Sequence, residues 1–81
     1  MNEIDLINAL KKKFKHLKKK KLKIKDDLAE QMILDSLELM EFMLYLEKRK
    51  YLKLKEYTEN YKDFKLLNIL RHINNNKKIS N

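Results

Sequence analysis

Apolar residues recur at helical spacing in three separate stretches of this 81-residue chain. In the first stretch they fall three or four positions apart, at Ile4, Ile7, Leu10, Phe14 and Leu17. Because one face of an α-helix repeats every 3.6 residues, this spacing predicts an amphipathic helix from about Asn2 to Leu17. Asn2 is a favourable N-cap, and Glu3 and Asp5 add negative charge to the first turn.

A second helix is predicted to begin at Asp35 or Ser36, and its apolar residues form two neighbouring rows. The first row contains Leu39, Phe42, Met43 and Leu46. The second row contains Leu37, Met40 and Leu44. If the first row faces the core, the second lies exposed beside Glu38, Glu41 and Glu47. The alternative is a single wide core stripe that buries both rows.

A long loop and two further helices complete the expected fold. Residues 18–34 lack helical periodicity and predict a long ordered loop held by a few buried side chains. Residues 56–60 predict a short third helix, and Asp63 can cap a last helix whose buried side ends at Ile73. We therefore expect an all-α, four-helix bundle with a long loop between helices 1 and 2. This domain covers residues 1–73, and residues 74–81 are expected to form a polar, flexible tail.

Several functional classes are excluded or disfavoured by composition. The sequence has no cysteine, which excludes a disulfide framework and a cysteine-based metal site. The first residues, Met1 to Asp5, carry acids and no apolar run, unlike a signal peptide. The longest apolar run, residues 42–46, is far shorter than a membrane span. His16 and His72 fit no metal-binding or triad pattern. We expect a cytoplasmic protein without a catalytic residue or a metal site of its own.

Charge is segregated along the chain, whose net charge is +8. Ten of the fifteen residues from Lys11 to Lys25 are lysine and none is acidic. From Asp26 to Glu47, seven of 22 residues are acidic and none is lysine or arginine. The lysine run is open to two interpretations: a phosphate-binding face of a basic nucleic-acid-binding module, or a solvated helix end and loop enriched in lysine by an AT-rich genome. Uniform drift toward lysine would not leave the acidic segment, so something keeps the middle of the chain negative. For the lysine run we favour the solvated helix end, and nucleic acid is not the partner we expect first.

Asp35-Ser36-Leu37-Glu38 is a short motif with two possible meanings. Asp35 at the N-cap with Glu38 three residues later is a capping box, which stabilises a helix by about 1 kcal/mol. A hydroxyl in the first turn of a helix is also accessible to a modifying enzyme, and the partial positive charge of the helix N-terminus favours an attached phosphodiester. The motif alone does not separate these meanings.

The order of elements around this motif resembles the acyl carrier protein family. In that family Asp-Ser-Leu opens the second helix of a four-helix domain of about this length, after a long loop. Fatty-acid carriers usually read Gly-Ala-Asp-Ser-Leu, whereas this chain reads Ile33-Leu34-Asp35-Ser36-Leu37. Residues 28–36 look closer to D-alanyl carrier proteins, which read Leu-Phe-Glu-Glu-Gly-Leu-Leu-Asp-Ser, with Met32 in place of their glycine. The basic first helix is foreign to the family.

The resemblance implies that Ser36 carries 4′-phosphopantetheine, transferred from coenzyme A by a phosphopantetheinyl transferase. Asp35 is then a candidate for helping that enzyme to position its Mg²⁺. The chain would be a carrier and not an enzyme, holding an acyl or aminoacyl group as a thioester loaded by a ligase of a specialised pathway. An interaction module that keeps the carrier fold without the modification is a further hypothesis. We expect a monomer.

A docking surface for these partner enzymes is predicted on the second helix. An apolar strip edged with carboxylates suits a partner that presents basic and apolar groups. The residues predicted to form this surface are Leu37, Glu38, Met40, Glu41, Leu44 and Glu47.

Overall fold

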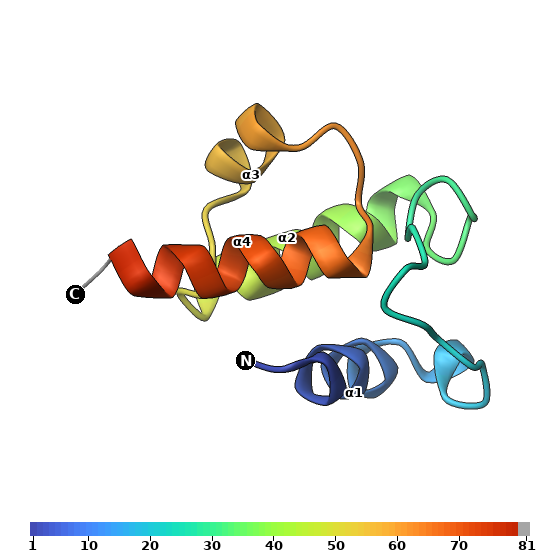
Figure 1. Cartoon of the computed structure of the whole chain (residues 1–81). Helices are drawn as coiled ribbons and strands as arrows, with labels where there is room; N and C mark the ends of the chain where they lie inside the picture. The colour runs from blue at the N-terminus through green and yellow to red at the C-terminus, as the bar shows by residue number, and fades with distance from the viewer. Residues whose placement is uncertain (80–81) are drawn as a thin grey trace.

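The computed structural model describes the backbone of residues 1–79 and the side chains of residues 1–75. Within this part the chain is helical, with no strand beyond one isolated bridge between Asp27 and Lys65. The elements are α1 (Glu3–Lys13), the 3₁₀ helix η1 (Lys15–Leu17), α2 (Ser36–Lys48), α3 (Leu54–Asn60) and α4 (Leu66–Ile79). Figure 1 shows α1 and α3 on opposite sides of α2 and α4. The all-α class and the short third helix are confirmed.

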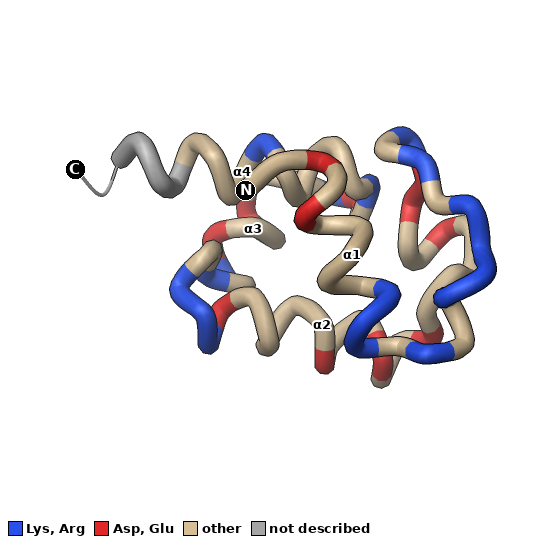
Figure 2. The backbone as a smooth tube through the Cα atoms, turned by 90° about the horizontal axis from the view of Figure 1, so that it is seen from below, with Lys and Arg blue, Asp and Glu red and all other residues tan. Residues whose placement is uncertain are grey.

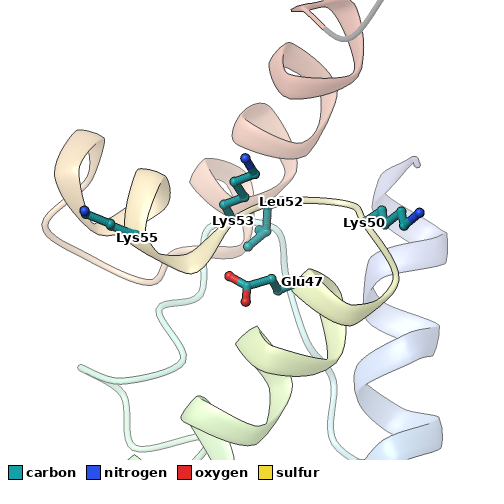
Figure 3. Close-up of a pocket in the computed structure, with 5 residues that line it drawn as sticks. All are labelled: Glu47, Lys50, Leu52, Lys53 and Lys55. Atoms are coloured by element: carbon teal, nitrogen blue, oxygen red, sulfur yellow. The ribbon is translucent and has the colours of Figure 1, made fainter.

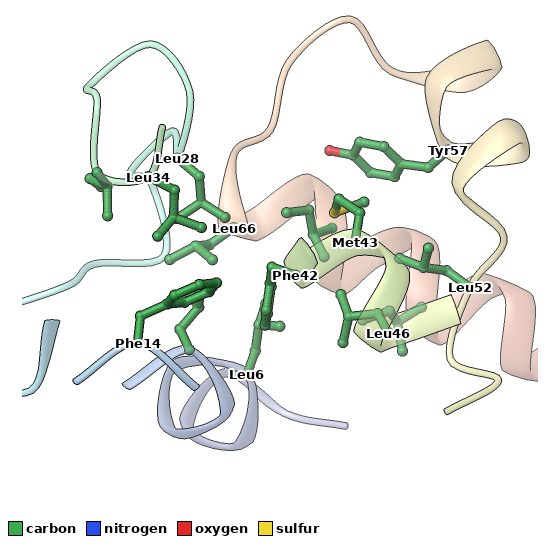
Figure 4. Packing of buried hydrophobic residues seen from close by; sticks show 14 of the residues in the cluster. Leu6, Phe14, Leu28, Leu34, Phe42, Met43, Leu46, Leu52, Tyr57 and Leu66 are labelled. Atoms are coloured by element: carbon green, nitrogen blue, oxygen red, sulfur yellow. The ribbon is translucent and has the colours of Figure 1, made fainter. Parts of the chain in front are cut away.

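One apolar core holds the helices together (Figure 4). From α2 it takes Phe42, Met43 and Leu46, each at most 1% exposed. These are three of the four residues of the row predicted to face the core, and the fourth, Leu39, is half-buried. The buried residues contributed by the other parts of the chain are Leu6, Leu10, Phe14, Leu17, Leu28, Ile33, Leu34, Leu52, Tyr57, Leu66, Ile69 and Ile73.

The first helix buries a different stripe from the one that the sequence predicts. Ile4 is 67% exposed, whereas Leu6 is fully buried. The series Leu6, Leu10, Phe14 and Leu17 is also helical in spacing, so periodicity alone does not decide between the two stripes. Packing of α1 against α4 selects the second one. The helix is also shorter than predicted, since Phe14 leaves the helical region with φ −119° and ψ 97° and η1 follows.

The long loop after η1 is ordered by its contact with the start of α4. The backbone N–H groups of Leu66 and Leu67 donate to the carbonyls of Asp26 and Ile24 at 2.9 and 2.8 Å. The N–H of Leu28 donates to the carbonyl of Phe64 at 3.0 Å. The first N–H groups of a helix lack partners within the helix, and here the loop supplies them. The loop therefore caps α4, which explains how so long a segment stays ordered.

The second half of this loop leads the chain into α2. The buried carboxylate of Asp27 accepts hydrogen bonds from the N–H groups of Ala29 and Glu30, both at 3.0 Å, and so closes a tight turn. Met32 follows with φ 54°, and its side chain is 85% exposed. Ile33 and Leu34 then enter the core and anchor the loop directly before α2.

The end of α2 has the hydrogen bonds of a Schellman motif. The N–H of Lys50 donates to the carbonyl of Glu47 at 2.9 Å, and that of Tyr51 to the carbonyl of Leu46 at 3.0 Å. Lys50 occupies the left-handed position of the motif with φ 66°, where glycine is usual. A chain without glycine thus places Met32 and Lys50 at its two left-handed positions among residues 1–79.

The fourth helix continues beyond its predicted end. The sequence predicts that it stops near Ile73, but the backbone of α4 remains helical to Ile79. The boundary at 73/74 is therefore not the end of the helix. A run of asparagines is a weak signal, because asparagine lowers helix propensity only modestly. The remainder of the predicted tail, residues 80–81, lies outside the described residues.

None of the described helices is long and apolar enough to span a lipid bilayer.

Candidate functional site

Ser36 is the first residue of α2, and it is exposed. The preceding residue, Asp35, is the N-cap: its Oδ1 accepts a hydrogen bond from the N–H of Glu38 at 2.8 Å. In return, Oε1 of Glu38 accepts from the N–H of Asp35 at 3.1 Å. The predicted capping box is therefore present. Because Asp35 and Glu38 complete the cap, the hydroxyl of Ser36 is not needed for it.

Two backbone donors remain free beside Ser36. Among the described residues, the N–H groups of Ser36 and Leu37 have no acceptor, as expected for the first positions of a helix. The other carboxylate oxygen of Asp35, Oδ2, also accepts no hydrogen bond from this part of the chain. The start of α2 thus presents a hydroxyl, two N–H donors and one carboxylate oxygen.

A shallow pocket of about 350 Å³ lies beside the hydroxyl of Ser36. The loop before α2 and the first turn of α2 line it together, and most of its lining is apolar. Its lining residues are Ala29, Met32, Leu34, Asp35, Ser36 and Leu39. The ordered loop before α2 therefore forms one wall of the candidate site.

The second apolar row of α2 is exposed. Leu37 is 70% exposed, Met40 47% and Leu44 48%. Their spacing of three and four residues keeps them on one face, and this face begins directly after Ser36. The interpretation of both rows as one wide core stripe is wrong, because only the first row is largely buried. Whether the exposed row docks a partner stays a prediction.

The three glutamates of the predicted docking surface have different environments. Glu38 belongs to the capping box, and its Oε2 also lies 3.6 Å from Nε2 of His16. Oε1 of Glu47 accepts a hydrogen bond from the N–H of Leu54 at 2.8 Å and so caps the first turn of α3. Glu41 is exposed and makes no hydrogen bond or ion pair with the described residues. Of the three, only Glu41 is free to act solely as a surface charge.

A second pocket, of about 520 Å³, lies where α2 passes into α3 (Figure 3). Glu47, Leu52 and three lysines line it. Figure 3 shows that Lys50, Lys53 and Lys55 point in different directions. Their charges do not converge on one point, and the carboxylate between them is already bound to the start of α3. This pocket is therefore a poor anion site.

The other polar candidates have structural roles. His72 is buried, at 8% exposed, and its ring lies 5.5 Å from that of Tyr57 and 5.9 Å from that of Tyr61. The hydroxyl of Tyr57 donates to the carbonyl of Asp63 at 2.8 Å, and burial raises the pKa of Tyr57. No group of acidic or histidine side chains in the described part of the chain can hold a metal ion.

Comparisons with models of known protein families, with curated proteins and with solved structures found no match. The resemblance to acyl carrier proteins therefore rests on the residues of this chain and on their arrangement.

Proposed function

We propose that this protein is a carrier that holds an acyl or aminoacyl group as a thioester on a 4′-phosphopantetheine arm attached to Ser36. The observation that carries the proposal is the position of Ser36. It is the exposed first residue of α2, and its hydroxyl is not needed for the helix cap, which Asp35 and Glu38 form. On this proposal, the four helices form a variant of the acyl-carrier bundle.

The surroundings of Ser36 suit a phosphodiester. The free N–H groups of Ser36 and Leu37 are donors for phosphate oxygens, and the partial positive charge of the helix N-terminus favours the anion by about 0.3–1 kcal/mol. In the transfer, Oγ of Ser36 bonds to the phosphorus that bears pantetheine, and the adenosine bisphosphate portion of coenzyme A leaves. The proton of Oγ passes to the transferase. Oδ2 of Asp35 is available to that enzyme's Mg²⁺.

The conformation of Met32 is independent support for the resemblance. D-alanyl carriers have glycine four residues before their serine, at the position of Met32. Met32 has φ 54°, in the left-handed region that glycine favours. This chain therefore adopts, at the position where those carriers have glycine, a conformation that glycine accommodates most easily.

The chemistry of a carrier needs little more from the chain than attachment and recognition. The thiol of the arm supplies the thioester when the arm is bound. Leu37, Met40 and Leu44 provide an exposed apolar strip beside the attachment point, with Glu41 as its free carboxylate. The partners would be a phosphopantetheinyl transferase and a ligase of a specialised, cytoplasmic pathway, each presenting basic and apolar groups. The carrier would be a monomer without catalytic activity.

The test is modification in vitro, read by the mass of the intact protein. Incubation with coenzyme A, Mg²⁺ and a broad-specificity phosphopantetheinyl transferase should add one phosphopantetheine group. The chain has two serines, Ser36 and Ser80, which offer matched variants. Ser36→Ala should abolish the mass gain and Ser80→Ala should leave it intact. No gain in the wild type, or a gain that persists in Ser36→Ala, would refute the proposal.

A further inference from the structure

Exposed lysines crowd the segment from Lys11 to Lys25, and we call the surface that they form the lysine surface. It covers the last turn of α1, η1 and the first part of the loop that follows (Figure 2). Nine of its ten lysines are exposed and Lys11 is half-buried. The ten residues are Lys11, Lys12, Lys13, Lys15, Lys18, Lys19, Lys20, Lys21, Lys23 and Lys25.

The lysine side chains of this surface have no carboxylate partner among the described residues. In the described part of the chain, none of its lysines forms an ion pair. Within the segment, it is His16 that pairs with an acidic residue, Glu38. Like charges so close together repel one another and oppose the compact state. A concentration of unpaired positive charge on one face is the electrostatic footprint of a protein that binds a polyanion.

Four lysines of the surface surround a hollow of about 480 Å³ at the end of α1. They are Lys11, Lys12, Lys15 and Lys18. Lys13, by contrast, reaches over the ring of Tyr45, with Nζ 5.3 Å from the ring centroid. The hollow therefore gathers positive charge from α1, η1 and the residue after η1, without an acidic residue in its lining.

The apolar residues of the segment face inward. Phe14 and Leu17 are 7% and 2% exposed, and Leu22 and Ile24 are half-buried against the core. The surface thus has no exposed apolar or aromatic anchor to insert into a bilayer or to fill a pocket on a protein. Its exposed ring is the imidazole of His16, whose Nε2 lies 3.6 Å from Oε2 of Glu38, so the surface offers no row of rings on which the bases of a single strand can stack. The binding groups that the surface presents are therefore mainly lysine charges, which suit a regular array of phosphates.

We propose that the lysine surface binds the phosphate backbone of a nucleic-acid duplex without sequence preference, with the four-lysine hollow at its centre. Lysine is a point-charge donor to phosphate oxygens, and such contacts carry no sequence information. The proposal does not rest on the modification of Ser36, so either one can fail without the other.

The experiment measures binding of the full chain to a short random-sequence duplex by fluorescence anisotropy, over a series of salt concentrations. Affinity should fall with salt by about 0.9 logarithmic units per tenfold for each phosphate contacted. For four contacts, this is roughly a hundredfold between about 50 and 200 mM salt. DNA and RNA duplexes should bind comparably, because the contacts are to phosphate.

Two quadruple variants separate a local site from net charge. The first changes the hollow, with Lys11, Lys12, Lys15 and Lys18 each replaced by Gln. The second removes the same charge from exposed lysines elsewhere, with Lys48, Lys53, Lys55 and Lys62 each replaced by Gln. Circular dichroism establishes that both remain helical. The hollow variant should lose most of the affinity and of the salt slope, and the control variant little.

Equal losses in the two variants would overturn the proposal, because they would indicate attraction by net charge. It would also be overturned by undetectable binding at low salt, or by tighter binding to a single strand or to vesicles of anionic lipid than to the duplex.

Discussion

Met32 stands at a left-handed backbone position, and replacing it with glycine should stabilise the protein. The left-handed conformation costs a residue with a Cβ atom about 1–2 kcal/mol. Glycine avoids this cost but has more conformational freedom in the unfolded chain, which offsets about 0.4–1 kcal/mol. The side chain of Met32 is 85% exposed, so its removal gives up little buried surface. The expected net gain in the free energy of unfolding is about 0.5–1 kcal/mol.

The alanine variant is the matched control. Met32→Ala removes almost as much side chain as Met32→Gly but keeps the Cβ atom, so it should bring no gain. Urea denaturation followed by circular dichroism measures both variants against the wild type. A gain of this size corresponds to a rise in Tm of roughly 2–8 °C for a domain of this length. A glycine variant no more stable than the alanine variant would contradict the left-handed conformation of Met32 and remove the support that this conformation gives to the resemblance.

Two further predictions follow from single contacts. Glu41→Lys should slow modification of Ser36 by the transferase without changing stability. Glu47→Lys should also lower the free energy of unfolding by about 1–2 kcal/mol, because it removes the hydrogen-bond acceptor at the start of α3. Equal stabilities of the two variants would contradict the capping role of Glu47. The hydrogen bond from Asn68 to Asp63, at 2.8 Å, lowers the pKa of that carboxyl. Its stabilising effect is present above the ordinary pKa of aspartate and is lost as the pH falls through the lowered value. Urea unfolding from neutral to acidic pH should therefore show a smaller acid loss in Asn68→Ala than in the wild type, and identical pH profiles would count against it.

Much of the candidate site can be read from residues close together in the sequence. The start of α2, its capping box and the place of Ser36 in the first turn depend on hydrogen bonds between residues three positions apart. The division of α2 into two apolar rows follows from helical periodicity. Local geometry determines these features, so four letters and their spacing are enough to predict them.

The remaining features depend on contacts between distant segments. Two stripes of α1 are equally helical, and only packing against α4 decides that Leu6 is buried and Ile4 exposed. No local pattern shows that Glu47 caps α3, since its partner lies seven residues away across a turn. The long loop is ordered because its carbonyls satisfy the first N–H groups of α4, some forty residues further along the chain.

The sequence by itself therefore determined the start of α2, its capping box and the exposed serine, because these rest on interactions within one or two turns. The tertiary structure decided which face of α1 is buried, which carboxylate on α2 is free, and how the loop forms a wall beside Ser36. One chain can bury its apolar side chains and hydrogen-bond its backbone groups in several alternative ways. Only the packing of all helices together selects one of these arrangements.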